Sequence, residues 1–340
     1  WTNAYDEAAF PAAIQSAAAG DEIWVKAGVY RPSTTNDATK SFVLKNGVAV
    51  YGGFAGTEAA SADRSPTANV TVLTGDLAND DEGKINGVTV SADQIKGTNS
   101  LCVVTTNPGC GMTTILDGFT ITAGKNTDNG GGMDITESDL IVTNCAFSGN
   151  SAPNGGGIAT SESDPVIEDC RFSGNKAASH GGGMFDKGGS STLRRCTFSG
   201  NTANRGGGMA LTDGSLTALS DCTFTGNASV EGGGMYNDGS APTVTNCAFA
   251  GNTSNTSESG GGGMCNKNSS PTVTNCAFSG NSAIAGGAMA NYSNSIPTIT
   301  NSTFSGNAGT NGGGMYNNNS SNPLVRNCIF WTSPAERFST

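Results

Sequence analysis

Apolar and polar residues recur in a fixed order through residues 144 to 330. The heptapeptide NCAFSGN at 144–150 returns unchanged at 275–281 and with one change at 246–252. Its phenylalanine recurs every 25 to 29 residues. These residues are Phe147, Phe172, Phe198, Phe224, Phe249, Phe278, Phe304 and Phe330. A period of about 20 to 50 residues is typical of repeat proteins, in which each repeat packs against its neighbours.

Two further positions keep a constant spacing from each phenylalanine. A cysteine, or once Ser302, stands two residues before it, and an asparagine stands three residues after the first seven. The cysteines are Cys145, Cys170, Cys196, Cys222, Cys247, Cys276 and Cys328. The asparagines are Asn150, Asn175, Asn201, Asn227, Asn252, Asn281 and Asn307. A glycine-rich block ending in Met or Ile, such as GGGM at 181–184, precedes each of these motifs.

The alternation within Cys-x-Phe predicts a short strand that points both side chains to one face. The segment PTVTN at 242–246 and 271–275 predicts a second strand, which ends at a turn-forming Asn. Glycine triplets disfavour a helix and favour tight bends. We therefore predict coils of 25 to 29 residues with three short strands and three corners. The length variation between the Asn and the Met indicates a surface loop there.

A unit made only of strands is too short for a propeller blade and lacks the pattern of a leucine-rich repeat. A parallel β-helix fits, because each strand then pairs with its copies at about 4.8 Å and equivalent residues stack in ladders. In such ladders the phenylalanines form the core, and the asparagines hydrogen-bond along the axis or to corner backbone groups.

The cysteine ladder has two interpretations. Redox or metal chemistry would need thiolates that converge on one point, whereas a ladder spreads them along a line. We therefore expect small buried apolar side chains with free thiols. Cys102 and Cys110, outside the ladder, are the best candidates for a disulfide.

Residues 1–95 read as an N-terminal cap with irregular first coils, and residues 96–340 as the regular repeats of the same continuous solenoid. The segment 11–19 predicts a short helix that ends at Gly20, places Ile14 and Ala18 on one face and covers the open end of the solenoid. Strands are predicted at 22–25, 41–44, 48–54, 70–76 and 88–91.

The paired motifs FxxN and GGxI or GGxM resemble the repeats of the polymorphic outer-membrane protein family of bacterial surface proteins. The stretch GDEIWVKAGVYRP, followed by FVLKNGVAVYGGFAGTE, is similar to the N-terminal part of large secreted right-handed β-helix proteins. The resemblance implies an all-β, right-handed parallel β-helix that is secreted or displayed on a bacterial cell surface, often as an adhesin. It assigns no catalytic residue, and the same superfamily includes pectate-lyase-like enzymes. The family's membrane-embedded C-terminal anchor has no counterpart in these residues.

The amino-acid composition limits the kinds of fold and of binding partner that the chain can have. Fifty glycines and only 36% hydrophobic residues among 340 suit turns and thin sheets better than a large globular interior. A net charge of −11 argues against a nucleic-acid partner. No apolar run is long enough for a transmembrane segment. Because the chain begins at Trp1, we interpret it as part of a longer protein.

Charged residues gather between 162 and 205, where Glu168, Asp169, Arg171 and Arg195 could form the site of a polysaccharide lyase. The alternative is structural. Glu168 and Asp169 lie one repeat before Arg194 and Arg195, and Asp221 lies one repeat after Arg195, so opposite charges would stack as cross-strand pairs. The register favours this second interpretation.

Three smaller features could carry chemistry. His180 is the only histidine, which removes most acid–base and nucleophilic schemes, and its position before GGGM indicates a polar turn residue. Asp76, Asp80, Asp81 and Glu82 could hold Ca²⁺, although their spacing fits no standard calcium loop. Phe185, Tyr236 and Tyr316 follow the Met of their coils and could point outward to stack on sugar rings.

The residues therefore favour a non-catalytic extracellular scaffold or adhesin that presents loops such as 253–260 to a polysaccharide or to a host or neighbouring-cell surface protein. Two alternatives stay open. One is a lyase or hydrolase of polysaccharides, and the other is a module that self-associates into filaments. Calcium is the one cofactor that the sequence suggests.

Overall fold

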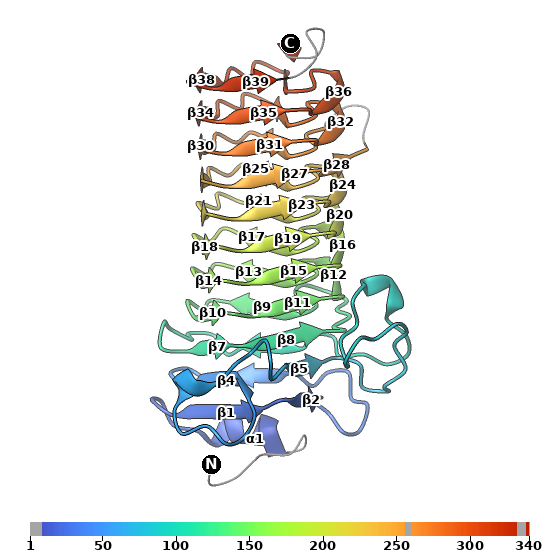
Figure 1. Ribbon diagram of the computed structural model, residues 1–340, viewed down its shortest axis with the longest axis vertical. Coiled ribbons are helices and arrows are strands. Elements are labelled where there is room, and N and C mark those ends of the chain that lie inside the picture. The colour runs from blue at the N-terminus through green and yellow to red at the C-terminus, as the bar shows by residue number, and fades with distance from the viewer. Residues whose placement is uncertain (1–8, 256–259, 332–337, 340) are drawn as a thin grey trace.

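In a computed structural model, residues 9–255, 260–331 and 338–339 of the chain are described. The chain winds into a straight stack of coils whose strands pair in parallel, with the single α-helix at one end (Figure 1). This is the predicted all-β parallel solenoid. Residues 256–259 of the predicted loop 253–260 lie outside the described part.

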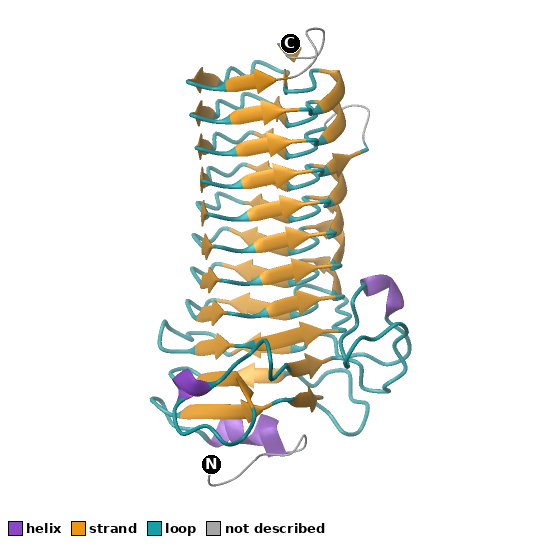
Figure 2. Cartoon of the chain, viewed as in Figure 1, coloured by secondary structure: helices purple, strands orange, loops and turns teal. Residues whose placement is uncertain are grey.

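A full coil passes through four sheets, which we number 1 to 4 in chain order (Figure 2). Sheet 1 contains β1 (Glu22–Lys26), β4 (Ala49–Phe54), β7 (Ile115–Asp117), β10 (Ile141–Thr143), β14 (Val166–Glu168), β18 (Thr192–Arg194), β22 (Ala218–Ser220), β26 (Thr243–Thr245), β30 (Thr272–Thr274), β34 (Thr298–Thr300) and β38 (Leu324–Arg326). Sheet 2 contains β2 (Gly28–Tyr30), β5 (Thr71–Thr74), β8 (Phe119–Thr122), β11 (Ala146–Ser148), β15 (Arg171–Ser173), β19 (Thr197–Ser199), β23 (Thr223–Thr225), β27 (Ala248–Ala250), β31 (Ala277–Ser279), β35 (Thr303–Ser305) and β39 (Ile329–Trp331).

Sheet 3 occurs only in the regular coils. It contains β12 (Ser151–Asn154), β16 (Lys176–His180), β20 (Thr202–Arg205), β24 (Ala228–Glu231), β28 (Thr253–Ser254), β32 (Ser282–Ala285) and β36 (Ala308–Asn311). Sheet 4 contains β3 (Phe42–Leu44), β6 (Val104–Thr106), β9 (Met133–Thr136), β13 (Ile158–Ser161), β17 (Met184–Lys187), β21 (Met209–Thr212), β25 (Met235–Asp238), β29 (Met264–Lys267), β33 (Met289–Tyr292), β37 (Met315–Asn317) and β40 (Phe338–Ser339). The helices are α1 (Ala9–Ser16) and the 3₁₀ turns η1 (Ser61–Asp63) and η2 (Ala92–Gln94).

Sheet 3 corrects the prediction of three strands per coil. The segment between the ladder asparagine and the glycine block, expected to be a loop, pairs with its copies in seven coils. Its small side chains, such as Ala152 and Ala177, stand opposite each other in the parallel register. Strands on both sides of residue 95 belong to the same sheets, so β4 pairs with β7 and β5 with β8.

The predicted phenylalanine ladder forms the core. From Phe147 to Phe330 the centroids of successive rings lie 4.4 to 5.1 Å apart, with ring planes within 8° of parallel. The rings from Phe147 to Phe304 are fully buried. The register of sheet 2 places each ring directly over the previous one.

The asparagine ladder satisfies every polar group of the buried carboxamides. Asn201 donates from Nδ2 to the carbonyl oxygen of Phe172 at 2.9 Å and to Oδ1 of Asn227 at 3.0 Å. Its own Oδ1 accepts from N and Nδ2 of Asn175 at 3.1 and 3.0 Å. Two donated and two accepted bonds exhaust the capacity of an Asn side chain. The amides therefore connect successive coils along the axis, as expected.

Each turn from sheet 1 to sheet 2 depends on one residue in the left-handed region. Its φ lies between 50° and 56° in eight successive coils. The residues are Asn144, Asp169, Arg195, Asp221, Asn246, Asn275, Asn301 and Asn327. Asn and Asp tolerate this conformation best among residues with a Cβ, and Arg195 is the exception in the column.

The cysteine ladder consists of free thiols, as predicted. Cys196, for example, donates from Sγ to the carbonyl oxygens of Ile167 at 3.3 Å and Arg194 at 3.4 Å. Ser302 fits the same position because its hydroxyl donates to the carbonyl oxygen of Thr300 at 3.0 Å and accepts from the backbone N of Cys276 at 3.1 Å. Burial raises the pKa of the Cys170 thiol well above its ordinary value. Cys170 is therefore a neutral thiol, and among the described residues the ladder cysteines do not gather into a metal-ligand set.

The N-terminal helix closes the first coil, as predicted, but it begins and ends earlier than residues 11–19. Phe10 and Ile14 are buried, and the Phe10 ring packs 5.2 Å from that of Phe42. Ala18 lies after the end of the helix and is exposed. No helix in the described part of the chain is long and apolar enough to cross a membrane.

The predicted strand at 88–91 does not form. These residues belong to an insertion between β5 and β6 that forms a lobe at the side of the stack (Figure 1). Thr122 donates from Oγ1 to the carbonyl oxygen of Thr89 at 2.9 Å, and the backbone N of Ala92 donates to the carbonyl oxygen of Gly174 at 3.0 Å. Backbone groups of the insertion therefore form hydrogen bonds with the coils, and residues 88–91 do not join a sheet.

Replacing Asn201 with leucine is expected to lower the free energy of unfolding by at least about 3 kcal/mol, because three buried partners, each worth about 1–3 kcal/mol, lose their hydrogen bonds. Urea denaturation followed by circular dichroism measures this change. The neighbouring exposed Thr202, changed to alanine, is the control and should shift stability by less than about 0.5 kcal/mol. Equal midpoints for the two variants would contradict the role of the ladder.

Replacing Asp186 with asparagine is expected to stabilise the protein by about 1–2 kcal/mol. Asp186 is fully buried, and its Oδ1 has no hydrogen-bond partner in the described part of the chain. Equivalent positions two and three coils later hold Asn237 and Asn266, whose amides bond to each other at 2.8 Å. Thermal unfolding at pH 7 should show a higher midpoint for Asp186→Asn. A lower midpoint would mean that the carboxylate has a role of its own.

Candidate functional site

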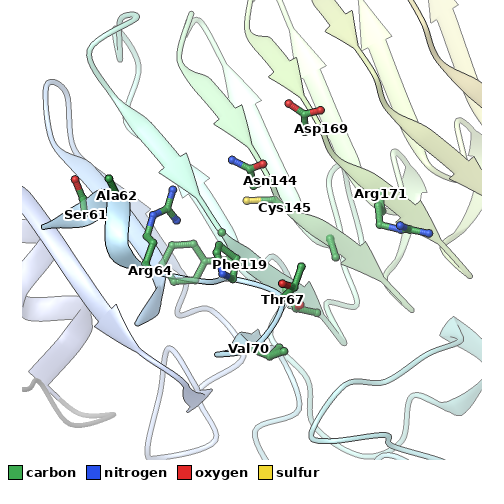
Figure 3. Close-up of a pocket in the computed structure, with 14 residues that line it drawn as sticks. Ser61, Ala62, Arg64, Thr67, Val70, Phe119, Asn144, Cys145, Asp169 and Arg171 are labelled. Atoms are coloured by element: carbon green, nitrogen blue, oxygen red, sulfur yellow. The ribbon is translucent and has the colours of Figure 1, made fainter. Parts of the chain in front are cut away.

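A groove of about 630 Å³ lies where sheet 1 turns into sheet 2 in the early coils. The segment between β4 and β5 forms one wall and includes Arg64, whereas Asn144, Asp169 and Arg171 come from successive coils of the solenoid. Figure 3 shows Arg64 and Arg171 on opposite sides, with Asn144 and Cys145 between them. The volume is typical of small-molecule and oligosaccharide sites.

Arg64 holds the wall in place. Its Nη2 donates to Oδ2 of Asp117 at 2.5 Å, its Nη1 donates to the carbonyl oxygen of Gly52 at 2.9 Å, and its guanidinium lies 5.0 Å from the Tyr51 ring. The two charged side chains are only 12% and 10% exposed. Truncating one partner of so buried a pair would leave an uncompensated charge. Arg64 therefore has a structural role, and its charge is already neutralised.

Two of the charge pairs predicted from the sequence form beside the groove, in the coils of Asp169 and Arg195. Arg195 donates from Nε and Nη2 to the two carboxylate oxygens of Asp169, each at 2.8 Å, and Arg194 donates to Glu168 at 2.7 Å. These hydrogen bonds and the Arg195 charge lower the pKa of Asp169, and the same contacts raise the pKa of Arg195. The further pair expected with Asp221 does not form, because Arg195 turns toward the preceding coil and Asp221 accepts from Asn246 at 3.3 Å. Arg195 therefore stays protonated and cannot act as a base.

Arg171 differs from the other candidates. It is exposed, and it is the only charged residue in the eleven strands of sheet 2 in the described part of the chain. The register places Ala146 and Thr197 beside it, one coil before and one after. No salt bridge is found for Arg171 within the described residues. Its guanidinium is available to a ligand in the groove.

The structure thus brings together two of the four predicted catalytic candidates, Asp169 and Arg171. Glu168 and Arg195 do not line the groove and serve the charge pairs. The sequence did not single out Arg64 or Asn144. Asn144 donates from Nδ2 to Oδ1 of Asp117 at 3.0 Å. The recurrence of Asn or Asp at the position of Asn144 in other coils could have identified this corner from the sequence. The position of Arg64 could not be predicted in this way, because Arg64 lies in a loop outside the repeats.

The expectation of outward aromatics for sugar stacking is wrong for Tyr236, which is fully buried. The strands point Tyr236 and the half-buried Tyr316 away from the phenylalanine core, but Arg205 and His180, at the ends of sheet 3 strands, lie 5.7 and 6.3 Å from the Tyr236 ring. A second apolar cluster results, with Tyr236 fully buried, Phe185 8% exposed and Tyr316 packed against its end. The other members are Ala210, Cys265, Ala290 and Tyr292.

Cys102 and Cys110 do not form the predicted disulfide, and both thiols are free and buried. Cys102 donates from Sγ to the carbonyl oxygen of Val104 at 3.0 Å, whereas Cys110 contacts the carbonyl oxygen of Leu44 at 3.8 Å. Burial raises the pKa of both thiols. Each thiol bonds to the strand beside it, so the two do not meet.

His180 was predicted to be a polar turn residue, but it is the half-buried last residue of strand β16. Its Nδ1 lies 2.8 Å from Oγ of Ser179 and 3.1 Å from Oδ1 of Asn154. Burial, together with the nearby charge of Arg205, lowers its pKa. The imidazole is therefore neutral at pH 7, and it does not line the groove.

The acidic insertion brings three of the four predicted calcium ligands together. Carboxylate oxygens of Asp76, Asp80 and Asp81 lie within 4.8 Å of one another, whereas Glu82 is directed to Lys96 at 3.7 Å. Burial and the Asp76 charge raise the pKa of Asp81. Lys84 already places its ammonium 2.6 Å from Oδ2 of Asp76. A calcium ion would have to compete with this ammonium group.

Replacing Lys84 with methionine should therefore make thermal stability depend on calcium more strongly than in the parent chain. The expected result is a rise in the unfolding temperature on adding millimolar Ca²⁺ that exceeds the rise in the unchanged protein. The double variant Lys84→Met, Asp80→Asn is the control and should lose the calcium response. Identical temperatures for Lys84→Met in Ca²⁺ and in chelator would exclude a site here.

Comparison with known proteins supports the fold. A structural neighbour is a polygalacturonase from Erwinia carotovora ssp. carotovora, with 12% sequence identity and a TM-score of 0.51 over 99% of this chain and 94% of that one. The catalytic unit of a GH87 α-1,3-glucanase from Streptomyces thermodiastaticus strain HF3-3 has 13% identity and a TM-score of 0.35 over 96% and 66%. At 12% identity the likeness to the polygalacturonase concerns the fold alone. A search of curated proteins by sequence finds no match.

A family model described as the right-handed β-helix region matches residues 77–249 and 232–332. The two matches together cover most of the chain and coincide with the coils described above. The chain therefore belongs to the right-handed parallel β-helix family.

Proposed function

We propose that this chain is a non-catalytic, secreted or cell-surface β-helix scaffold that binds a polysaccharide in the groove between Arg64 and Arg171. The observation that carries the proposal is an exposed Arg171, without a salt bridge among the described residues, at the rim of a groove whose other charged groups, Arg64 and Asp169, form salt bridges. The resemblance of the FxxN and GGxM motifs to those of bacterial surface proteins supports the location.

The groove offers hydrogen-bonding groups of the kind that sugars need. Arg171 supplies a fork of N–H donors, Asn144 an amide and Thr120 a hydroxyl, all along one face of three successive coils. These groups repeat at about 4.8 Å along the axis, so they suit an extended polymer better than a compact ligand. The polygalacturonase is a precedent for such a ligand on this fold, although fold alone does not assign it.

We propose that the groove is not catalytic because it lacks a carboxyl group suited to act as an acid. Hydrolysis of a glycosidic bond usually needs two carboxyl groups, one of them protonated, on either side of the bond. The carboxylate that lines this groove is Asp169, and its hydrogen bonds with Arg195 lower its pKa. It is not suited to donate a proton. The rival is a lyase in which Arg171 acts as the base, because no salt bridge is found for Arg171 among the described residues.

Replacing Arg171 with alanine is expected to weaken binding on a glycan array by about tenfold, the effect of losing one or two charge-assisted hydrogen bonds. Arg326→Ala, which removes an exposed arginine from the last coil of sheet 1, is the matched control and should bind like the parent chain. The parent chain should release no unsaturated or reducing ends from a panel of acidic glycans, with or without Ca²⁺. Turnover that Arg171→Ala abolishes in a folded protein would establish the lyase instead.

A further inference from the structure

A second cavity lies on another side of the solenoid, over sheet 4, between the ends of the sheet 3 strands and the C-terminal ends of the sheet 4 strands. Its volume is about 540 Å³. The ends of the sheet 3 strands supply Asn154 and His180, the floor is Phe185 of the second apolar cluster, and Thr212 and Asp213 come from the end of β21. A coil passes in the order sheet 1, 2, 3, 4, so this trough and the Arg171 groove occupy different corners of the cross-section.

The trough is elongated along the axis. Its lining residues run from Asn129, in the coil of β9, to Asp238, at the end of β25. These coils are four steps apart in sheet 4, which corresponds to about 19 Å at the usual strand spacing. That length accommodates several units of an extended oligomer. A peptide strand could not add to either sheet here, because the strands are paired on both edges.

The charges of the trough are paired within the protein. Lys187 lies 3.7 Å from Asp213, and Asp238 lies 3.6 Å from Lys267 and accepts from the Tyr236 hydroxyl at 3.1 Å. The lining itself holds one lysine and two aspartates, and Lys267 balances Asp238 from outside the lining. Its remaining polar groups are neutral: amides, one imidazole and one hydroxyl.

The neutral groups form a continuous row on one lip. Asn154 donates from Nδ2 to Oδ1 of Asn129 at 2.9 Å, and the imidazole of His180 bonds to Oδ1 of Asn154 at 3.1 Å. Amides and hydroxyls can bind the hydroxyl groups of a sugar, and the Phe185 ring, which is 8% exposed, adds an apolar edge to the floor of the cavity. The charged side chains of the trough are already in ion pairs, so they are less available to a charged ligand.

We propose that this trough binds an uncharged oligosaccharide of several sugar units, lying parallel to the solenoid axis. The site is independent of the Arg171 groove, so the two proposals can fail separately. If both sites are used, one molecule holds two glycan chains at different corners and can cross-link them.

The test uses fluorescence anisotropy with labelled cellohexaose, laminarihexaose, mannohexaose and xylohexaose as probes. The background is Arg171→Ala, which removes the groove's main ligand group. At least one probe should bind this background, and adding Thr212→Trp, which fills the trough, should weaken that binding by at least about tenfold. Thr202→Trp is the control, because Thr202 is an exposed residue of β20 that lines neither cavity, and binding should stay within about threefold.

Two outcomes would overturn the proposal. One is that none of the four probes binds the Arg171→Ala protein, and the other is that Thr212→Trp leaves binding unchanged while circular dichroism shows a folded chain. If Arg171→Ala alone removes all binding, the groove is supported and the trough is rejected.

Discussion

The whole structure depends on superposition of like groups in successive coils. Backbone pairing sets the repeat, but buried polar groups decide whether the coils can stay in register. From Asn175 to Asn281, the carboxamide of each ladder asparagine bonds to the coil before and the coil after, with no capacity left over. A shift of one residue would break all of these bonds and remove the rings of the neighbouring column from contact. Register is therefore specified by hydrogen bonds and by ring packing at the same positions.

The same constraint explains where chemistry can occur. Most residues of a coil are committed to a ladder, a corner or a close backbone approach. Gly157 is one case, since a Cβ there would lie 2.4 Å from the carbonyl oxygen of Gly183. Variation is confined to outward positions and insertions, and Arg171 and the Arg64 loop are of this kind. The Arg171 groove thus combines one outward residue of a regular strand with an irregular segment outside the repeat.

Sequence periodicity predicted the ladders because those residues interact with copies of themselves, so a spacing is sufficient to identify a contact. It predicted less where the partner is a different segment. The alternation of β25 correctly pointed Tyr236 away from the main core, but only the structure shows that it is fully buried. The strands of sheet 3 escaped prediction because their polar, small residues pair through register and have little strand preference of their own. The pairing expected for Cys102 and Cys110 failed for a related reason, since nothing in the chain fixes their separation.

Because successive coils have the same cross-section, no single coil determines how many coils the solenoid contains. Except for the coil with Ser302, the coils from Phe172 to Phe304 present the same amides, rings and thiols to both neighbours, so inserting or deleting one of them would leave these contacts chemically unchanged. The helix-capped end differs from these coils. The distance between that end and any feature on the shaft can thus change in steps of about 4.8 Å without redesign. Such a molecule can set the separation between two features on its surface in increments of one coil.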